Sequence, residues 1–270
     1  MLAEGREHEA ARQMQLERDR AQLALTRQVA QRLDAEMRQL AAVGHSIEAT
    51  LAQREDWQES QLTNWLTDLL TRDDRIHGLT LAFEPFQFDK NQEEFCLYVW
   101  HSPEGIRPKR LLSPEYRYRE WDWYNKPIAQ QRPLWIGPFM DTGGGEVPMV
   151  SYSVPLRQRG RSVGAMTVDL PVEYFKRLWR WLAELNLGKH SYGFVISGAG
   201  LFINHPKYQM PCNITELEKV DPEFVALARR MLKGETGRGI AIDPSTGKTA
   251  TFLFAPVLSA GWSFVAVIEE

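Results

Sequence analysis

The sequence predicts an α+β fold in which a long N-terminal helix is followed by two modules, each with a central antiparallel sheet. Residues 3–53 contain no proline and have the composition of one continuous helix. After this helix, short apolar runs alternate with turn residues, and a similar order of strands and helices occurs twice. A chain of 270 residues has room for two modest domains with hydrophobic cores of their own.

Composition limits the classes of function. The formal net charge is −3 with both signs mixed, so we expect no nucleic-acid partner. Cys96 and Cys212 lie far apart and lack metal-ligand spacing, so we expect no disulfide framework, no metal and no cofactor. No run of about 18 apolar residues is present, so we expect neither a membrane span nor a signal peptide within the chain.

The N-terminal helix carries an apolar stripe in its second half. The spacing alternates between four and three residues, as in a heptad pattern. The stripe consists of Leu33, Met37, Leu40, Gly44, Ile47 and Leu51. Upstream, Asp19 and Thr26 interrupt the pattern, so that half would be only marginally stable alone in water. Two interpretations stay open: the stripe packs against its own domain, or it also meets a parallel helix of a second subunit in a homodimer.

The first module begins with a helix that starts at Asp56 or Ser60 and ends near Arg72. Asn186 and Gly188 are predicted to end its last helix. The elements between are strands at 78–85 and 94–100, a short helix at 121–130, a hairpin of strands 148–158 and 162–170 with its turn at 159–161, and an amphipathic helix at 172–185.

The second module repeats this pattern on a smaller scale. Its elements are strands at 191–197 and 201–206 around a turn at 198–200, a helix from Asp221 to Gly234, and strands at 237–243, 249–257 and 262–268. Two strands, a helix and three antiparallel strands are the order of a PAS-like domain. Residues 76–185 show a similar order, so both modules are predicted to be PAS-like.

Six short motifs follow one another along the chain. They are W-Y at 123–124, W-x-G-P-F-x-D at 135–141, S-x-S-x-P at 151–155, G-x-x-x-x-D at 164–169, G-x-x-x-x-H-P at 200–206 and G-W-S at 261–263. In order and spacing they resemble the double Cache family, which comprises extracytoplasmic sensor segments of bacterial chemoreceptors, sensor kinases and related membrane receptors. The resemblance covers nearly the whole chain.

The resemblance implies a division into three parts. Residues 1–53 would be a long signalling helix, 54–187 a membrane-distal ligand-binding module and 188–270 a membrane-proximal module. It also implies a periplasmic location and membrane anchoring by flanking transmembrane helices outside this sequence. The chain begins within a polar helix and ends on an apolar strand, as expected of a segment excised from a longer receptor.

In this family the membrane-distal module usually holds the ligand. Many amino-acid-sensing members carry Y-x-x-x-x-R-x-W-Y, the Asp of G-P-Y-x-D and the Asp of G-x-x-x-x-D. Aligned on the W-Y pair, this chain keeps Tyr116, Trp123, Tyr124, Asp141 and Asp169. Two positions differ, because Phe139 replaces a Tyr and Trp121 stands where the Arg is expected. A two-residue shift would return Arg119 to the site, Arg117 is a second candidate, and Ser151 completes the ligand-binding set.

These residues favour a cationic ligand. An Arg grips a carboxylate with two parallel hydrogen bonds, which an indole cannot do. Several aromatic faces with two carboxylates suit an amine or a quaternary ammonium group. An amino acid or derivative stays open through Arg119, as does another small molecule or none.

Structural roles compete with ligand binding. Trp121 could cap the core of the module, Asp141 could start a turn, and Asp169 could N-cap the next helix. The glycines at 143–145 lack the context of a phosphate-binding loop and are predicted to form a flexible lid or hairpin tip.

Catalytic motifs are missing from the sequence. The six His residues show no H-E-x-x-H spacing, and no G-x-S-x-G is present, so an enzyme is not expected. The predicted function is extracytoplasmic sensing of a small molecule. The alternative is a structural or protein-interaction module without a small-molecule ligand.

Overall fold

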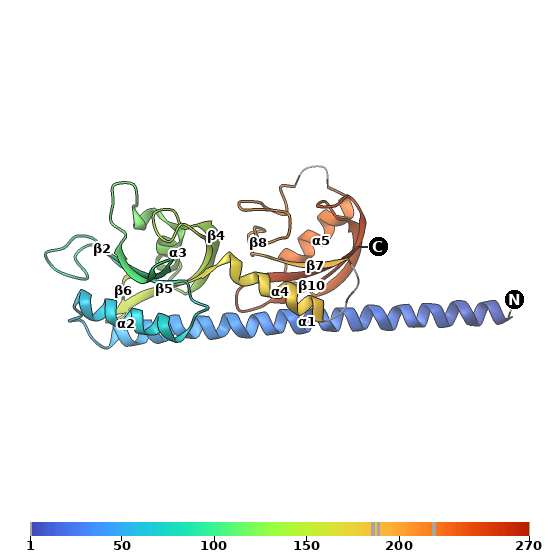
Figure 1. Ribbon diagram of the computed structural model, residues 1–270, viewed down its shortest axis with the longest axis horizontal. Helices are drawn as coiled ribbons and strands as arrows, with labels where there is room; N and C mark the ends of the chain where they lie inside the picture. Colours follow the sequence, from blue (N-terminus) through green and yellow to red (C-terminus); the bar gives the residue numbers. More distant parts are fainter. Residues whose placement is uncertain (1, 185–186, 188–189, 218–219, 270) are drawn as a thin grey trace. The chain divides into compact units, whose positions relative to one another are not determined.

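We describe the fold from a computed structural model of the chain (Figure 1). It describes residues 2–184, 187, 190–217 and 220–269. The contacts divide the chain into two compact units, Glu36–Tyr174 and Met1–Ala35 with Phe175–Glu270. This division differs from the predicted domain limits after residues 53 and 187, because the two halves of the N-terminal helix belong to different units.

Helix α1 (Leu2–Ala52) is the single long helix that the sequence predicts. All residues of the apolar stripe are buried within the chain. A Cβ at Gly44 would lie 3.1 Å from Val154 and 3.2 Å from Tyr152, so this part of α1 lies against the sheet of its own unit. The interpretation that the stripe packs against its own domain is confirmed. A homodimer through α1 stays a prediction and would have to use another face of the helix.

The unit Glu36–Tyr174 contains a six-stranded antiparallel sheet in the order β3-β2-β1-β6-β5-β4. Helices lie on both of its faces (Figure 1). Its elements after α1 are α2 (Glu59–Arg72), β1 (Gly78–Phe83), β2 (Phe95–Ser102), β3 (Gly105–Arg110), the 3-10 helix η1 (Tyr118–Glu120), α3 (Asp122–Gln130), β4 (Leu134–Met140), β5 (Pro148–Gln158) and β6 (Arg161–Pro171).

Alternation along the strands gives this sheet two different faces. One face is apolar and packs against α1 and α2. The buried residues of α2 are Leu62, Leu66 and Leu70. The opposite face carries small and polar residues in β1, β5 and β6 and is covered by α3. The polar face therefore places hydroxyl and carboxyl groups beneath α3.

Two strands of this sheet are missing from the sequence-based prediction. Strand β3 is largely polar and contains Pro108, and β4 contains a bulge between Ile136 and Phe139. Both lie at the edges of the sheet. An edge strand tolerates a proline and needs no continuous apolar run, so neither strand has a strong sequence signal. The hairpin of β5 and β6 is confirmed, with its turn at Arg159 and Gly160.

The second unit contains a five-stranded sheet in the order β8-β7-β11-β10-β9. The predicted helix at 172–185 is divided into a 3-10 turn and a shorter α-helix, and position 185 lies outside the described residues, as do Asn186 and Gly188. The elements from residue 172 onward are η2 (Val172–Lys176), α4 (Arg177–Glu184), β7 (Ser191–Ile196), β8 (Phe202–Asn204), α5 (Pro222–Leu232), β9 (Gly237–Ile242), β10 (Thr249–Val257) and β11 (Trp262–Glu269).

The two sheets share one topology. The first is β2-β1-β6-β5-β4 with β3 added at an edge, and the second is β8-β7-β11-β10-β9. In both, a helix, α3 or α5, stands between the first strands and the last three. The predicted fold class, a long helix followed by two α+β modules with central antiparallel sheets, is confirmed.

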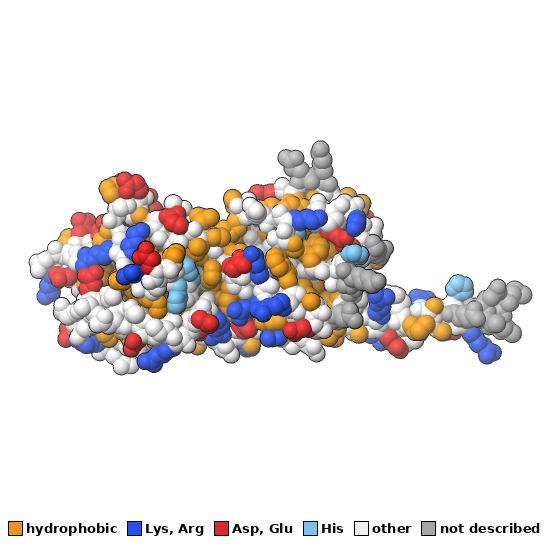
Figure 2. All heavy atoms as spheres, in the orientation of Figure 1, with side chains coloured by type: hydrophobic (Ala, Val, Ile, Leu, Met, Phe, Trp, Pro, Cys, Tyr) orange, Lys and Arg blue, Asp and Glu red, His pale blue; other side chains and the backbone are white. Residues whose placement is uncertain are grey.

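The surface offers no strong single-sign field on the side that Figure 2 draws. Acidic and basic side chains are interspersed over it. Among the described helices, none has both the length and the apolar composition that crossing a bilayer requires.

Candidate functional site

The polar face of the first sheet brings Asp169 and Ser151 together. Asp169 in β6 lies opposite Gly78 of β1 on one side and Ser151 of β5 on the other. Residues directly opposite each other in antiparallel strands point to the same face. These three residues therefore form one row across the sheet. The next row on this face consists of Thr80, Thr167 and Ser153.

Asp169 is a buried carboxylate, with 3% of its surface exposed. Its Oδ1 accepts a hydrogen bond from the Ser151 hydroxyl at 2.5 Å, and its Oδ2 accepts a weaker one from Thr80 at 3.5 Å. Burial raises the pKa of Asp169 to about 7; the Ser151 hydrogen bond opposes this rise and the charge of Asp141 adds to it. Because Asp169 lies inside β6, the alternative that it N-caps a helix is wrong.

Asp141 follows β4 and is 5% exposed. Its Oδ2 accepts a hydrogen bond from the Gly145 N–H at 2.5 Å, and its carbonyl oxygen accepts from Gly144 and Glu146. It does start a turn, as the structural alternative predicts. Burial raises its pKa, and the Gly145 N–H opposes that rise. Neither Asp141 nor Asp169 forms an ion pair with any residue that the structure describes.

Aromatic rings of the predicted set gather beside Asp141. Tyr116 stacks on Trp121 with ring centroids 5.2 Å and planes 21° apart, and Trp121 lies 6.1 Å from Phe139. Burial and the charge of Asp141 raise the pKa of Tyr116, while the Trp123 indole beside it opposes the rise. Trp121 is partly exposed and also covers the core cluster, as its structural alternative predicts.

Tyr98 belongs to the same site although sequence reasoning missed it. Burial raises its pKa well above the usual value, with further contributions from Asp169 and Asp141, so its hydroxyl lies near both carboxylates. The glycine at position 78 makes room for this ring, because a Cβ there would lie 2.5 Å from a Tyr98 ring carbon.

Four buried polar atoms at this site have no hydrogen-bond partner of normal geometry. They are Tyr98 Oη, Ser153 Oγ, Thr167 Oγ1 and His77 Nε2. The hydroxyls of Tyr98 and Thr167 lie close enough to Asp141 and Asp169, respectively, to lower the pKa of each carboxyl, but they are not aligned for hydrogen bonds. A buried polar atom left unpaired costs about 1–3 kcal/mol. A polar ligand on this face would remove that cost.

The second sheet provides an internal comparison. Asp243 follows β9 as Asp141 follows β4, in the corresponding strand of the shared topology. Asp243 is buried, but its two oxygens accept hydrogen bonds from the Tyr192 hydroxyl and the Ser245 N–H, both at 2.8 Å. The aspartate of the second unit is thus satisfied by its own chain, whereas the first unit leaves polar atoms unpaired.

Two predicted residues bond to glutamates instead of to this site. Arg119 forms an exposed ion pair with Glu94 at 3.0 Å, and the Tyr124 hydroxyl donates to Glu84 at 2.9 Å. Arg117 forms an exposed ion pair within its own helical turn, at 3.3 Å. Among the residues that the structure describes, no Arg contacts the two aspartates, and the sequence position of the expected Arg is taken by Trp121.

The loop of residues 141–147 contains Asp141 and packs closely against Tyr116 and His77 through its glycines. Gly143 has φ +85°, and a Cβ there would lie 2.9 Å from the Tyr116 ring. A Cβ at Gly145 would lie 2.7 Å from His77 Nε2. Glycines at these positions let the backbone approach the site more closely than any other residue would.

The Gly143→Ala substitution is expected to destabilise the protein by about 1–3 kcal/mol more than Gly160→Ala. Both glycines have positive φ, +85° and +78°, so both alanines pay a similar backbone cost. Only Gly143 has a neighbour, since nothing lies within 4 Å of a Cβ at Gly160. Urea denaturation of the two variants measures the difference. Equal stabilities would show that the loop does not press against Tyr116.

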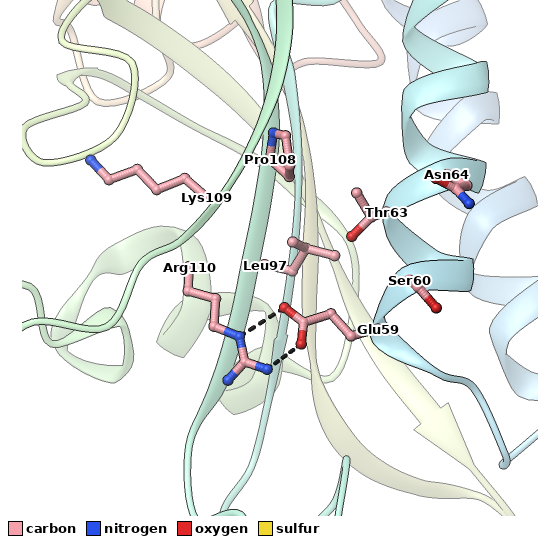
Figure 3. A pocket seen from close by; sticks show the side chains of 8 residues that line it. All are labelled: Glu59, Ser60, Thr63, Asn64, Leu97, Pro108, Lys109 and Arg110. Atoms are coloured by element: carbon pink, nitrogen blue, oxygen red, sulfur yellow. Dashed lines mark hydrogen bonds and ion pairs between the residues drawn. The ribbon is translucent and has the colours of Figure 1, made fainter.

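Two surface hollows lie away from the predicted residues. One, of about 460 Å³, lies between α2 and β3 (Figure 3). The other, of about 180 Å³, lies beside the C-terminal end of α5. Because both aspartates are almost completely buried, a ligand can reach them only when a covering segment such as the loop 141–147 moves.

No group of three or more potential metal ligands occurs among the residues described by the structure. Cys96 and Cys212 are both free thiols, without a disulfide.

Comparison with protein families matches residues 62–177 to the family described as methyl-accepting chemotaxis protein-like, first PDC sensor domain. Two curated relatives are chemotaxis proteins. The methyl-accepting chemotaxis protein PctB of Pseudomonas aeruginosa is 27% identical over 37% of this chain and 15% of its own length. PscA of Pseudomonas syringae pv. tomato is 23% identical over 66% of this chain and 27% of its own length. The chain thus spans only a minor part of either relative.

Solved structures show the same fold. The extracellular domain of the histidine kinase mmHK1S-Z3 superposes with a TM-score of 0.82 at 23% identity, over 94% of both chains. The ligand-binding domain of PctB, solved in complex with L-Arg, superposes with a TM-score of 0.66 at 17% identity, over 92% of this chain and 86% of that chain. At these identities, the likeness concerns the fold.

Proposed function

We propose that this chain is the extracytoplasmic sensing portion of a bacterial transmembrane receptor, because residues 62–177 match the first PDC sensor domain of methyl-accepting chemotaxis protein-like receptors. The receptor would place it in the periplasm, anchored by transmembrane helices that flank it. Its own activity would be ligand capture, and any catalytic output would belong to another domain. This chain shares its fold with the extracellular domain of a histidine kinase and with the ligand-binding domain of a chemoreceptor, which supports this proposal.

The ligand that fits best is a small cationic amine or quaternary ammonium compound. The single observation that carries this assignment is the pair of buried carboxylates, Asp141 and Asp169, which no described basic side chain neutralises by an ion pair. A bound ammonium group would do so with charge-assisted hydrogen bonds, and the rings of Tyr116 and Trp123 would add cation–π attraction.

An amino acid is the second candidate. The structure of PctB with L-Arg shows that a protein of this fold binds one. In this chain the amino group would meet Asp141 and Asp169, but the carboxylate would need Arg119 to leave its ion pair with Glu94. That exchange breaks one ion pair to form another and adds the cost of removing water from the ligand's carboxylate, so amines without a carboxylate are expected to bind more tightly.

Calorimetric titration with one matched pair of ligands, and with a quaternary ammonium compound, tests the ligand class. Agmatine and L-arginine share a guanidinium tail and differ by a carboxylate, and choline carries a permanent charge. We expect agmatine to bind more tightly than L-arginine. The Asp141→Asn variant is expected to weaken both ligands. Tight binding only of carboxylates that lack an amine would contradict the proposal.

The alternative, a structural or protein-interaction module, predicts no response to any small molecule. Thermal melts separate the two, because a ligand at 100 times its dissociation constant adds about 2.7 kcal/mol of stability. Unchanged melting temperatures across a broad panel of amines and amino acids would favour the alternative.

We also propose that receptor subunits pair through α1, with the faces that the buried stripe leaves free. Sedimentation of the purified chain measures this directly. A monomer at high protein concentration would contradict strong pairing of subunits through α1.

A further inference from the structure

One side chain holds the loop of residues 141–147 from outside. Lys109 lies in the edge strand β3, and its Nζ donates a hydrogen bond to the Gly143 carbonyl oxygen at 2.7 Å. Burial raises the pKa of Asp141, and the charge of Lys109 opposes that rise, so the ammonium group lies within electrostatic reach of the site. Lys109 therefore links an edge of the sheet to the loop that contains Asp141.

The register of β3 directs Lys109 toward this loop. Lys109 lies opposite Tyr98 in β2, so the two side chains share the face that carries the site. The next residue, Arg110, points to the other face and forms a two-bond ion pair with Glu59 of α2. Figure 3 shows Arg110 meeting Glu59 while Lys109 extends away from α2. Strand β3 thus forms an ion pair with α2 on one face, through Arg110, and a hydrogen bond with the loop on the other, through Lys109.

The Gly143 carbonyl that Lys109 binds lies in the part of the loop that contacts the site. A Cβ at Gly143 would press on the Tyr116 ring, and two residues later the Gly145 N–H donates to Asp141. Movement of the Gly143 carbonyl would displace both contacts. The ammonium of Lys109 is bonded to this carbonyl and not to a carboxylate, which leaves the aspartate pair available for a cation.

We propose that Lys109 is a positioning residue for ligand capture, which latches the loop of residues 141–147, and with it Asp141, in place at the site. Its role in capture rests on the proposed function of that site, whereas the latch itself does not. Lys109 acts through the loop backbone and makes no contact with the ligand. Its loss should open the loop more often and release any bound ligand faster.

Hydrogen exchange of the whole chain, read by mass spectrometry, tests the latch without a ligand. The amides of Gly144, Gly145 and Glu146 are hydrogen-bonded to Asp141 inside the loop itself, so their exchange reports local unfolding of this turn. In Lys109→Met their exchange is expected to be about five- to tenfold faster, the effect of losing one exposed charge-assisted hydrogen bond. Lys109→Arg keeps a donor and should restore part of the protection.

The matched control is Lys126→Met, which removes an exposed lysine that pairs with Asp122 on α3. Its loop amides should exchange as in the wild type. Equal exchange in Lys109→Met and wild type, or an equal rise in both lysine variants, would overturn the latch. With agmatine as the probe, Lys109→Met should dissociate about five- to tenfold faster. If agmatine fails to bind, the proposed ligand class fails and the exchange result still decides the latch.

Discussion

The Asp169→Asn variant is expected to melt at a higher temperature than the wild type at pH 8 and to bind a cationic ligand at least about 100-fold more weakly. Asp169 is 3% exposed, and burial raises its pKa from 3.8 to about 7. The folded protein therefore binds this proton more tightly than the unfolded chain. The contribution of Asp169 to stability is full below about pH 4 and is lost as the pH rises to about 7.

The size of this effect follows from the same values. A rise from 3.8 to about 7 corresponds to about 4 kcal/mol at most. Part of this gain is offset, because an amide cannot accept hydrogen bonds from both Ser151 and Thr80 as the carboxylate does. We expect a net gain of about 2 kcal/mol, or about 4–8 °C in melting temperature.

Scanning calorimetry at pH 8 and pH 4 measures the difference. At pH 4 the gain should disappear, because the wild-type Asp169 is then protonated. Asp122→Asn, on the exposed side of α3, is the control and should alter neither the melting temperature nor ligand affinity by much. A variant less stable than the wild type at pH 8 would contradict the claim that the ionised Asp169 destabilises the unliganded protein.

Affinity for a permanently charged ligand such as choline is expected to fall as the pH is lowered. Asp169 must lose its proton to pair with a cation, so each pH unit below its pKa of about 7 costs up to tenfold in affinity. Between pH 8 and pH 5 the loss should reach about 100-fold. Burial lowers the pKa of His77 and so disfavours its charged form, and the nearby His101 adds to this effect.

Titration calorimetry at constant ionic strength checks this pH dependence. The Asp169→Asn variant provides the control, since its weaker binding should lose the part of the pH dependence that Asp169 causes and keep only the part due to Asp141, whose pKa burial also raises. Constant affinity in the wild type, or tighter binding at pH 5, would contradict the assignment of Asp169 as the group that pairs with the ligand.

The parts of the fold with a local signal could be predicted from sequence. Helix α1 and the hairpin of β5 and β6 depend on periodicity and turn residues within one segment, and both are confirmed. Strands β3 and β4 could not be predicted in this way. They are held at the edges of a sheet by partners elsewhere in the chain, and their own sequences contain proline.

The site shows the same limit. Asp141 and Asp169 could be predicted as site residues from the motifs that end in them. Thr167 could be placed on the same face of the sheet because it lies two residues from Asp169 in one strand. Tyr98 had no such signal, since its place depends on how β2 pairs with β1. The direction of Arg119 is set by Glu94, 25 residues away, which no local pattern reveals.

The cationic group of the ligand is expected to bind between Asp141 and Asp169. The most direct measurement is a crystal structure with the tightest-binding compound of the amine and amino-acid panel. We predict that its cationic group lies within hydrogen-bond or van der Waals contact of both carboxylates, against the Tyr116 and Trp123 rings. A ligand held by its carboxylate on Arg119, or bound only in the second unit, would contradict the assignment of Asp141 and Asp169 as the cation site.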